Sequence, residues 1–178
     1  MRSARYIPIT LLVLVLCIAL TSGFAFVAPK KTVPSVDPKF TAEPSSTDEQ
    51  DLFLAMKAAA KPFQAVMREN SQTFTALREQ LVADVETARI RIEEFLSTAI
   101  TADQLALIES QLSSLRDLND RIEADVGDLG AEMTILRGRN TDLDMDGMIA
   151  AYEAAIQIQN GRIALAEEAI ALVNAIAR

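Results

Sequence analysis

Apolar residues recur at intervals of three and four along most of this chain, and no proline interrupts them between Phe63 and Arg178. This spacing places the apolar residues on one face of an α-helix, because the helix repeats every 3.6 residues. Proline breaks helices, so its absence allows long, uninterrupted ones. The abundance of Ala, Leu, Ile and Glu also favours helix over strand. We therefore predict an all-α fold.

Four helical segments are predicted, at residues 47–61, 62–99, 101–139 and 147–177. Thr47 with Gln50, and Thr101 with Gln104, match the capping-box pattern with which helices begin. Pro62 disfavours helical geometry in the residue before it, so a kink is expected there. The apolar face predicted for the second segment comprises Phe63, Val66, Asn70, Phe74, Leu77, Leu81, Val85, Ala88, Ile92, Phe95 and Ala99.

The segment 101–139 has the most regular apolar spacing, with Asn119 as the one polar member of its seam. Such regularity is typical of left-handed, coiled-coil-like packing. Polar residues in an apolar seam fix register or oligomeric state, and we assign this structural role to Asn119 and Gln159. The last segment is apolar on two faces and needs neighbours on both. We predict an elongated antiparallel bundle of three long helices, forming coiled-coil hairpins, and a homo-oligomeric assembly.

Composition excludes several function classes. The chain has no His, which is the commonest general base and transition-metal ligand, and its one cysteine is Cys17. We find no constellation of catalytic residues and predict that the protein is not an enzyme. The formal net charge of −8 argues against a nucleic-acid partner, because no basic patch is available for phosphates.

The N-terminus has the pattern of an export signal. Arg2 and Arg5 precede an apolar run over residues 7–28, and small residues at Gly23 and Ala25 are compatible with cleavage after Ala25. An uncleaved anchor is the alternative, because the run just spans a bilayer. Residues 1–28 are therefore a signal peptide or membrane anchor, and 29–46 a proline-rich flexible linker. Both alternatives predict an extracytoplasmic protein, secreted, periplasmic or anchored facing outward, that meets the membrane only through this segment.

Residues 142–153 read D-L-D-M-D-G-M-I-A-A-Y-E, which satisfies the pattern of an EF-hand calcium loop. In such a loop carboxylates at positions 1, 3 and 5, a backbone carbonyl at position 7 and a bidentate Glu at position 12 surround the ion. The predicted Ca²⁺ ligands are Asp142, Asp144, Asp146, Met148 and Glu153, with Gly147 allowing the sharp turn.

A helix cap is the alternative interpretation of the same residues. Acidic side chains at a helix N-terminus are stabilised by the helix dipole, and Asp142 or Thr141 would then be the N-cap. The flanks also differ from those of an EF-hand, since Gly138 and Thr141 stand where apolar residues are usual, and there is no second loop. Any calcium bound here would be structural and of low affinity.

The string Ile100-Thr101-Ala102-Asp103-Gln104 resembles the L-T-x-x-Q motif of the Spy/CpxP family of periplasmic chaperones and envelope-stress proteins. The resemblance implies a helical cradle that dimerises and holds unfolded clients, with an architectural likeness over residues 60–178. Thr101 and Gln104 would form the turn between two helices. The chain departs from the family because it has one such motif rather than two, and because it is acidic where a cationic cradle is expected.

These observations predict a non-enzymatic, extracytoplasmic scaffold or interaction protein that acts through its coiled-coil surfaces. Low-affinity Ca²⁺ at residues 142–153 would stiffen it. The alternatives are a Spy/CpxP-like chaperone that holds unfolded clients, and a calcium-dependent binding module. The identity of a protein partner or client does not follow from the residues.

Overall fold

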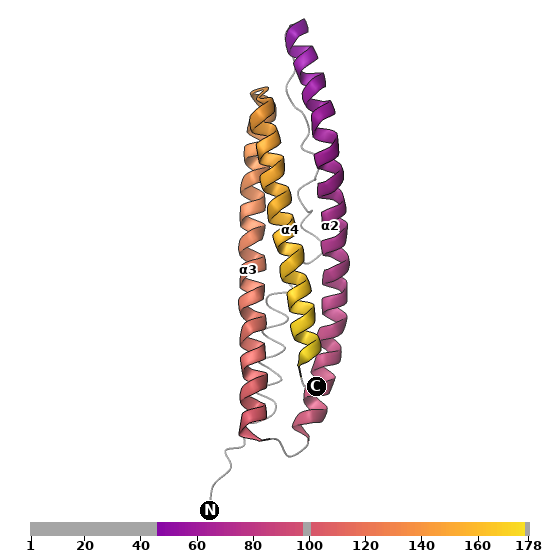
Figure 1. Cartoon of the computed structure of the whole chain (residues 1–178), viewed down its shortest axis with the longest axis vertical. Helices are drawn as coiled ribbons and strands as arrows, with labels where there is room; N and C mark the ends of the chain where they lie inside the picture. Colours follow the sequence, from indigo (N-terminus) through magenta and orange to yellow (C-terminus); the bar gives the residue numbers. More distant parts are fainter. Residues whose placement is uncertain (1–45, 98–100, 177–178) are drawn as a thin grey trace, which may run out of the picture. The chain divides into compact units, whose positions relative to one another are not determined.

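The structure, a computed structural model, describes residues 46–97 and 101–176 (Figure 1). It contains the helices α2 (Thr47–Leu96), α3 (Ala102–Thr141) and α4 (Met145–Ala175). The three helices pack against each other as a bundle, which confirms the prediction of an all-α fold with three long helices. The predicted signal peptide or anchor and the predicted linker up to residue 45 lie outside the described residues.

The predicted start of α2 is corrected, whereas the predicted start of α3 is confirmed. The N-cap of α2 is Ser46 rather than Thr47, because Ser46 Oγ accepts a hydrogen bond from the Glu49 backbone N–H at 3.2 Å. At the start of α3 the predicted capping box is formed. The Thr101 N–H donates to Gln104 Oε1 at 2.9 Å, and the Gln104 N–H donates to Thr101 Oγ1 at 3.2 Å.

Pro62 does not divide the first helical region, which was predicted as segments 47–61 and 62–99. It lies inside α2, which runs through it without a break. The ring removes one backbone hydrogen bond, which costs about 3 kcal/mol in a helix interior. Core residues on both sides, Ala60 and Met67, hold the helix against the bundle and offset that loss. The side chain of Pro62 is itself exposed, so the freed carbonyl can be hydrated.

The chain divides into two compact units, and each contains a part of all three helices. Among the described residues, unit 1 comprises 77–97, 101–121 and 165–176, and unit 2 comprises 46–76 and 122–164. Consecutive helices run in opposite directions in each unit, as predicted from their short connectors (Figure 1).

Unit 2 has a core of nine buried residues with a fully buried aromatic side chain at its centre. Tyr152 stacks on Phe63 of α2, with ring centroids 5.5 Å apart and an interplanar angle of 12°. The Tyr152 hydroxyl accepts a hydrogen bond from Gln64 Nε2 at 3.0 Å. The core consists of Met56, Ala60, Met67, Met133, Leu136, Met148, Ala151, Tyr152 and Ala155. Burial of these apolar groups is what holds the three helices together.

Unit 1 buries aliphatic residues from each helix, among them Leu81, Ile92, Ile108, Leu115 and Val173. Polar contacts also join α2 to α4. Asn174 Nδ2 donates to Asp84 Oδ2 at 3.0 Å, and Arg91 Nη1 donates to the Asn174 carbonyl at 3.4 Å. Asn119, the polar member of the predicted α3 seam, is buried.

Within residues 46–97 and 101–176, no helix is long and apolar enough to cross a membrane.

Candidate functional site

The turn between α3 and α4 contains the predicted calcium loop, and it is much shorter than such a loop. Only residues 142–144 separate the two helices. Leu143 has a φ of 54°, the left-handed conformation that commonly ends a helix. The Asp144 N–H donates to the Arg139 carbonyl at 3.0 Å, which is the six-to-one bond of a Schellman motif. The turn is therefore a helix C-cap followed at once by a new helix.

Asp144 is the N-cap of α4, which corrects the alternative prediction that Asp142 or Thr141 has this role. Its Oδ1 accepts a hydrogen bond from the Gly147 N–H at 2.9 Å, and its carbonyl accepts one from the Met148 N–H at 2.9 Å. Its Oδ2 forms a salt bridge with Arg139 Nη1 at 2.9 Å. Both carboxylate oxygens of Asp144 are thus occupied by groups of the protein.

The five predicted calcium ligands do not surround a common point in this arrangement. Asp142 is exposed in the turn, whereas Asp146, Met148 and Glu153 all lie within α4. Asp146 and Glu153 are separated by about 10 Å along the axis, at about 1.5 Å per residue. The Met148 side chain is fully buried in the unit 2 core. No group of three or more acidic or thiol side chains among the described residues could hold a metal ion.

The residues therefore do not fit a calcium ion while α4 begins at Met145. An EF-hand loop needs positions 1–9 out of the helix, so the first turns of α4 would have to unwind. Calcium binding at residues 142–153 stays a prediction of the sequence. The cap geometry gives Asp144 a structural role that requires no ion.

Calcium at about 5 mM, several-fold above the weakest EF-hand dissociation constants, is expected to leave the melting temperature of the full chain unchanged. Titration calorimetry is expected to show no binding heat, because Asp144 is already engaged by Arg139 and Gly147. A heat of binding that the Glu153→Gln variant abolishes would contradict this prediction and restore the loop interpretation.

Asp144→Ala is expected to lower the free energy of unfolding by about 1–2 kcal/mol, because it removes the N-cap. Asp142→Ala is the matched control two residues away. Asp142 has an exposed side chain with no described contact, so its change is expected to be under about 0.5 kcal/mol. Urea denaturation of both variants, followed by circular dichroism, measures the difference. Equal effects would show that Asp144 is not the cap.

Gly147 provides the space that the Asp144 cap occupies. A Cβ added at Gly147 would collide with the Asp144 carboxylate and would lie 2.8 Å from Arg139 Cδ. At Gly161, also in α4, the nearest atom to an added Cβ is Asp125 Oδ2 at 3.8 Å, an ordinary contact.

Gly161→Ala is therefore expected to stabilise the chain by about 0.5–1 kcal/mol, the helix propensity of Ala over Gly. Gly147→Ala is expected to give no such gain, because it displaces the cap. Thermal melts of the two variants make the comparison. An equal rise in melting temperature for both would mean that the cap adjusts without cost.

A second candidate site is an open groove between α2 and α4 in unit 2. The hollow measures about 410 Å³ and is lined by Pro62, Phe63, Val66, Glu153, Ile156, Gln157 and Asn160. Its floor is apolar, and its α4 side has polar and acidic groups at the rim. Asn70 Nδ2 donates to Asn160 Oδ1 at 2.8 Å and bridges the two helices beside the groove. Glu153, predicted as a calcium ligand, thus lies beside an apolar hollow.

Two further polar side chains of unit 2 lie between its helices. Gln159 is buried, and its Nε2 donates to the Met67 carbonyl and to Ser71 Oγ, each at 3.3 Å. It therefore ties α4 to α2, which suits the structural role predicted for it. The guanidinium of Arg162 lies 4.2 Å above the centre of the Phe74 ring. Burial lowers the pKa of Arg162, and the nearby carboxylate of Asp125 opposes that change.

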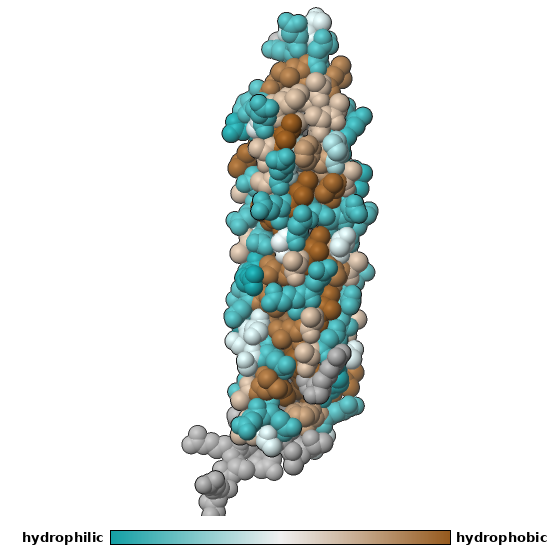
Figure 2. All heavy atoms as spheres, viewed as in Figure 1, coloured by the Kyte–Doolittle hydropathy of each residue, from teal (hydrophilic) through white to brown (hydrophobic). Residues whose placement is uncertain are grey.

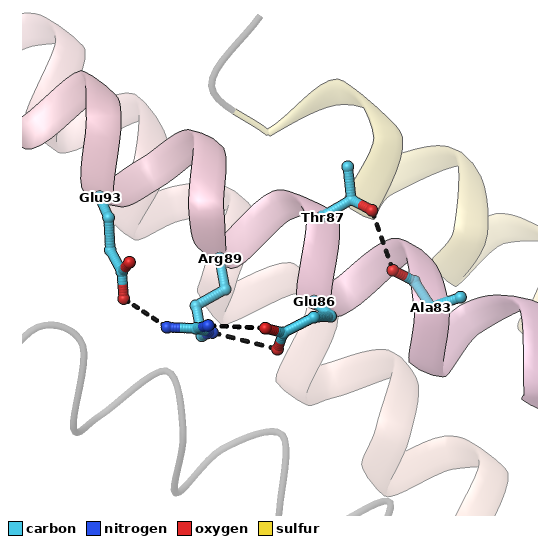
Figure 3. A network of polar contacts seen from close by, with 5 residues as sticks. All are labelled: Ala83, Glu86, Thr87, Arg89 and Glu93. Atoms are coloured by element: carbon cyan, nitrogen blue, oxygen red, sulfur yellow. Dashed lines mark hydrogen bonds and ion pairs between the residues drawn. The ribbon is translucent and has the colours of Figure 1, made fainter.

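Three charged residues of α2 in unit 1, Glu86, Arg89 and Glu93, form a network on one face of that helix (Figure 3). Arg89 bridges Glu86 and Glu93, with a nitrogen–oxygen distance of 2.6 Å to each. Its hydrogen bond lowers the pKa of Glu86. Spacings of three and four residues are those of pairs on a solvated helix surface. The network is an ordinary helix-surface feature rather than a site.

No protein-family model, curated protein or solved structure matches this chain.

Proposed function

We propose that this protein is a non-enzymatic helical scaffold or interaction protein that acts outside the cytoplasm through the surfaces of its helices. The supporting observation is the amount of aliphatic surface that the bundle leaves exposed. Figure 2 shows apolar side chains exposed among hydrophilic ones on the face viewed. The large exposed apolar residues are Leu52, Leu54, Val66, Val82, Ile90, Leu107, Val126 and Ile135.

These side chains are available for a partner because the bundle core does not use them. Leu54 and Leu107 are each 60% exposed, and Val82 is 53% exposed. Single exposed apolar residues are common. A partner that covered several of these residues would gain about 25 cal/mol for each Å² of apolar surface that it buries. The N-terminal pattern of residues 1–28 supports a location outside the cytoplasm. Mass spectrometry of the mature N-terminus tests whether this segment is cleaved or retained as an anchor.

The helices would pack as elongated, left-handed coiled-coil hairpins. Heptad spacing supports this geometry, since Ile108, Leu115, Ile122 and Leu136 are buried at multiples of seven residues. Self-association into a homo-oligomer is one way to cover the exposed aliphatic surface. Sedimentation velocity of the full chain over a range of concentrations tests it.

Site-specific photo-crosslinking in the cells that produce the protein tests the proposal. A photoreactive residue is placed at Val82, Leu107 or Ile135, and at the exposed polar control positions Gln80, Glu109 and Thr134. The apolar positions are expected to give discrete crosslinked species, identified by mass spectrometry, and the control positions far fewer. The absence of crosslinks at all three apolar positions would contradict an interaction function.

A Spy/CpxP-like chaperone is the second candidate, and the open groove between α2 and α4 favours it. An apolar floor exposed to solvent can hold apolar segments of an unfolded client. A chaperone of this kind would suppress aggregation of a reduced model substrate at near-stoichiometric amounts. A scaffold would leave aggregation unchanged, so light scattering separates the two candidates.

A further inference from the structure

One side of α2 in unit 2 has an apolar surface that continues beyond the groove. Five apolar residues follow one another at spacings of three and four, the spacing of neighbours on one helix side. We call this surface the α2 flank, and it consists of Leu52, Ala55, Ala59, Pro62 and Val66. Leu52 is 38% and Val66 40% exposed. The flank lies beside the core-facing line, because Val66 precedes the buried Met67 by one residue, or about 100° around the axis.

The flank and the groove adjoin each other in unit 2. Pro62 and Val66 belong to both, and the opposite wall is α4, which contributes Ile156 and Glu153. From Leu52 to Val66 the flank extends about 21 Å, the length of a helix of about fourteen residues. A surface with apolar positions at heptad spacing beside an open groove is the kind that accepts an amphipathic helix.

Acidic side chains border this surface at the two ends of the flank and on the α4 side of the groove. Asp48 and Glu69 continue the flank at its two ends, four residues before Leu52 and three after Val66. Asp146 lies two helical turns before Glu153 on the same side of α4. Four carboxylates thus border the surface, those of Asp48, Glu69, Asp146 and Glu153. None of them forms a salt bridge within the described part of the chain. Their charges are therefore available to a partner.

The basic residues of α2 in unit 2 are kept away from the flank. Lys57, Lys61 and Arg68 each lie two residues after a member of the flank, which places them on the opposite side of the helix. Unit 2 contains twice as many acidic as basic residues, so an acidic partner is repelled and a basic one attracted.

We propose that the α2 flank and its groove dock an amphipathic helix that has apolar residues at heptad spacing and Lys or Arg beside them. The apolar stripe fits against Pro62, Val66 and Ile156, and the basic side chains pair with the carboxylates that border the surface. The inference rests on the proposed interaction function and names the class of partner.

The test uses the full chain and two synthetic peptides of about fourteen residues, the length of the flank. One has Leu at heptad positions and Lys beside them, and the other has Glu in place of each Lys. Fluorescence anisotropy is measured at about 50 and 300 mM salt, where screening differs. The Lys peptide is expected to bind at least tenfold more tightly than the Glu peptide, and more weakly at high salt.

Two matched pairs of variants locate the surface. Val66→Asp is expected to weaken binding of the Lys peptide at least tenfold, whereas Leu54→Asp, on another side of α2, changes it less than twofold. Glu153→Lys is expected to weaken binding several-fold and to reduce its salt dependence, whereas Asp128→Lys on α3 does not. Circular dichroism checks that each variant keeps its helix content.

Several results would overturn the proposal. The wild-type chain could bind neither peptide or both equally, or Val66→Asp and Leu54→Asp could have the same effect. A homodimer that Val66→Asp abolishes would assign the surface to a second copy instead. Equal competition by an unfolded, reduced protein would assign it to clients without a helical motif. Crosslinks at Val82, Leu107 and Ile135, which lie off the flank, report on the interaction function separately.

Discussion

Leu136→Ala is expected to lower the free energy of unfolding by about 3 kcal/mol, within the range for deletion of a fully buried Leu side chain. Leu136 has no exposed surface, and it packs in the unit 2 core among residues of all three helices. The loss combines the transfer of the removed methyl groups with the cavity that rigid neighbours cannot fill. Urea denaturation followed by circular dichroism at 222 nm measures it.

Ile135→Ala is the matched control for this substitution. Ile135 is the preceding residue of the same helix, yet it is 46% exposed because it faces away from the core. Its truncation is expected to cost less than about 1 kcal/mol. A loss of similar size for both variants would place the core of unit 2 on a different face of α3.

The apolar periodicity predicted three long helices and also the buried residues Leu81, Ala88 and Ile92 of α2, but it was wrong at one position of the core. The predicted face placed Val66 in the core, whereas the structure buries Met67 and leaves Val66 exposed. Two adjacent stripes of α2 are apolar, since the core line and the α2 flank both have spacings of three and four. Hydrophobicity alone does not distinguish a stripe that faces the bundle from one beside it. Because Met67 rather than Val66 faces the core, Val66 and the α2 flank are left exposed to solvent.

The acidic turn shows why the candidate site was harder to predict than the helices. Carboxylates that coordinate calcium and carboxylates that cap a helix occur in the same short pattern, because both neutralise local positive charge. The backbone geometry of the turn is that of a helix cap. Leu143 has the left-handed conformation, and Asp144 is the residue directly before α4. Glycine usually occupies the position of Leu143, so the sequence lacked the usual signal for a tight helix end.

Asn140 is a buried residue that the apolar pattern of the sequence did not predict. It lies in the last turn of α3 and is 1% exposed, although the predicted helix ended at residue 139. The spacing could have predicted its burial, since Asn140 follows the buried Leu136 by four residues and the buried Met133 by seven. Neither amide atom of Asn140 has a hydrogen-bond partner among the described residues. Gln159, the other buried amide of unit 2, has partners in α2 for its Nε2, whereas its Oε1 has none among the described residues.

Asn140→Leu is expected to raise the free energy of unfolding by about 1–3 kcal/mol, the cost of burying an amide without hydrogen bonds. Leu has the same branching as Asn, and it continues the apolar register of α3. Gln159→Met is the matched control, and it is expected to lose stability because the bonds to Met67 and Ser71 disappear. Urea denaturation of both variants gives the two changes. If Asn140→Leu also destabilised the chain, the amide would have to be bonded in the native protein, for example through a buried water molecule. A higher free energy of unfolding for Asn140→Leu with a lower one for Gln159→Met would instead show that the hydrogen bonds of a buried amide, rather than its polarity, decide its effect on stability.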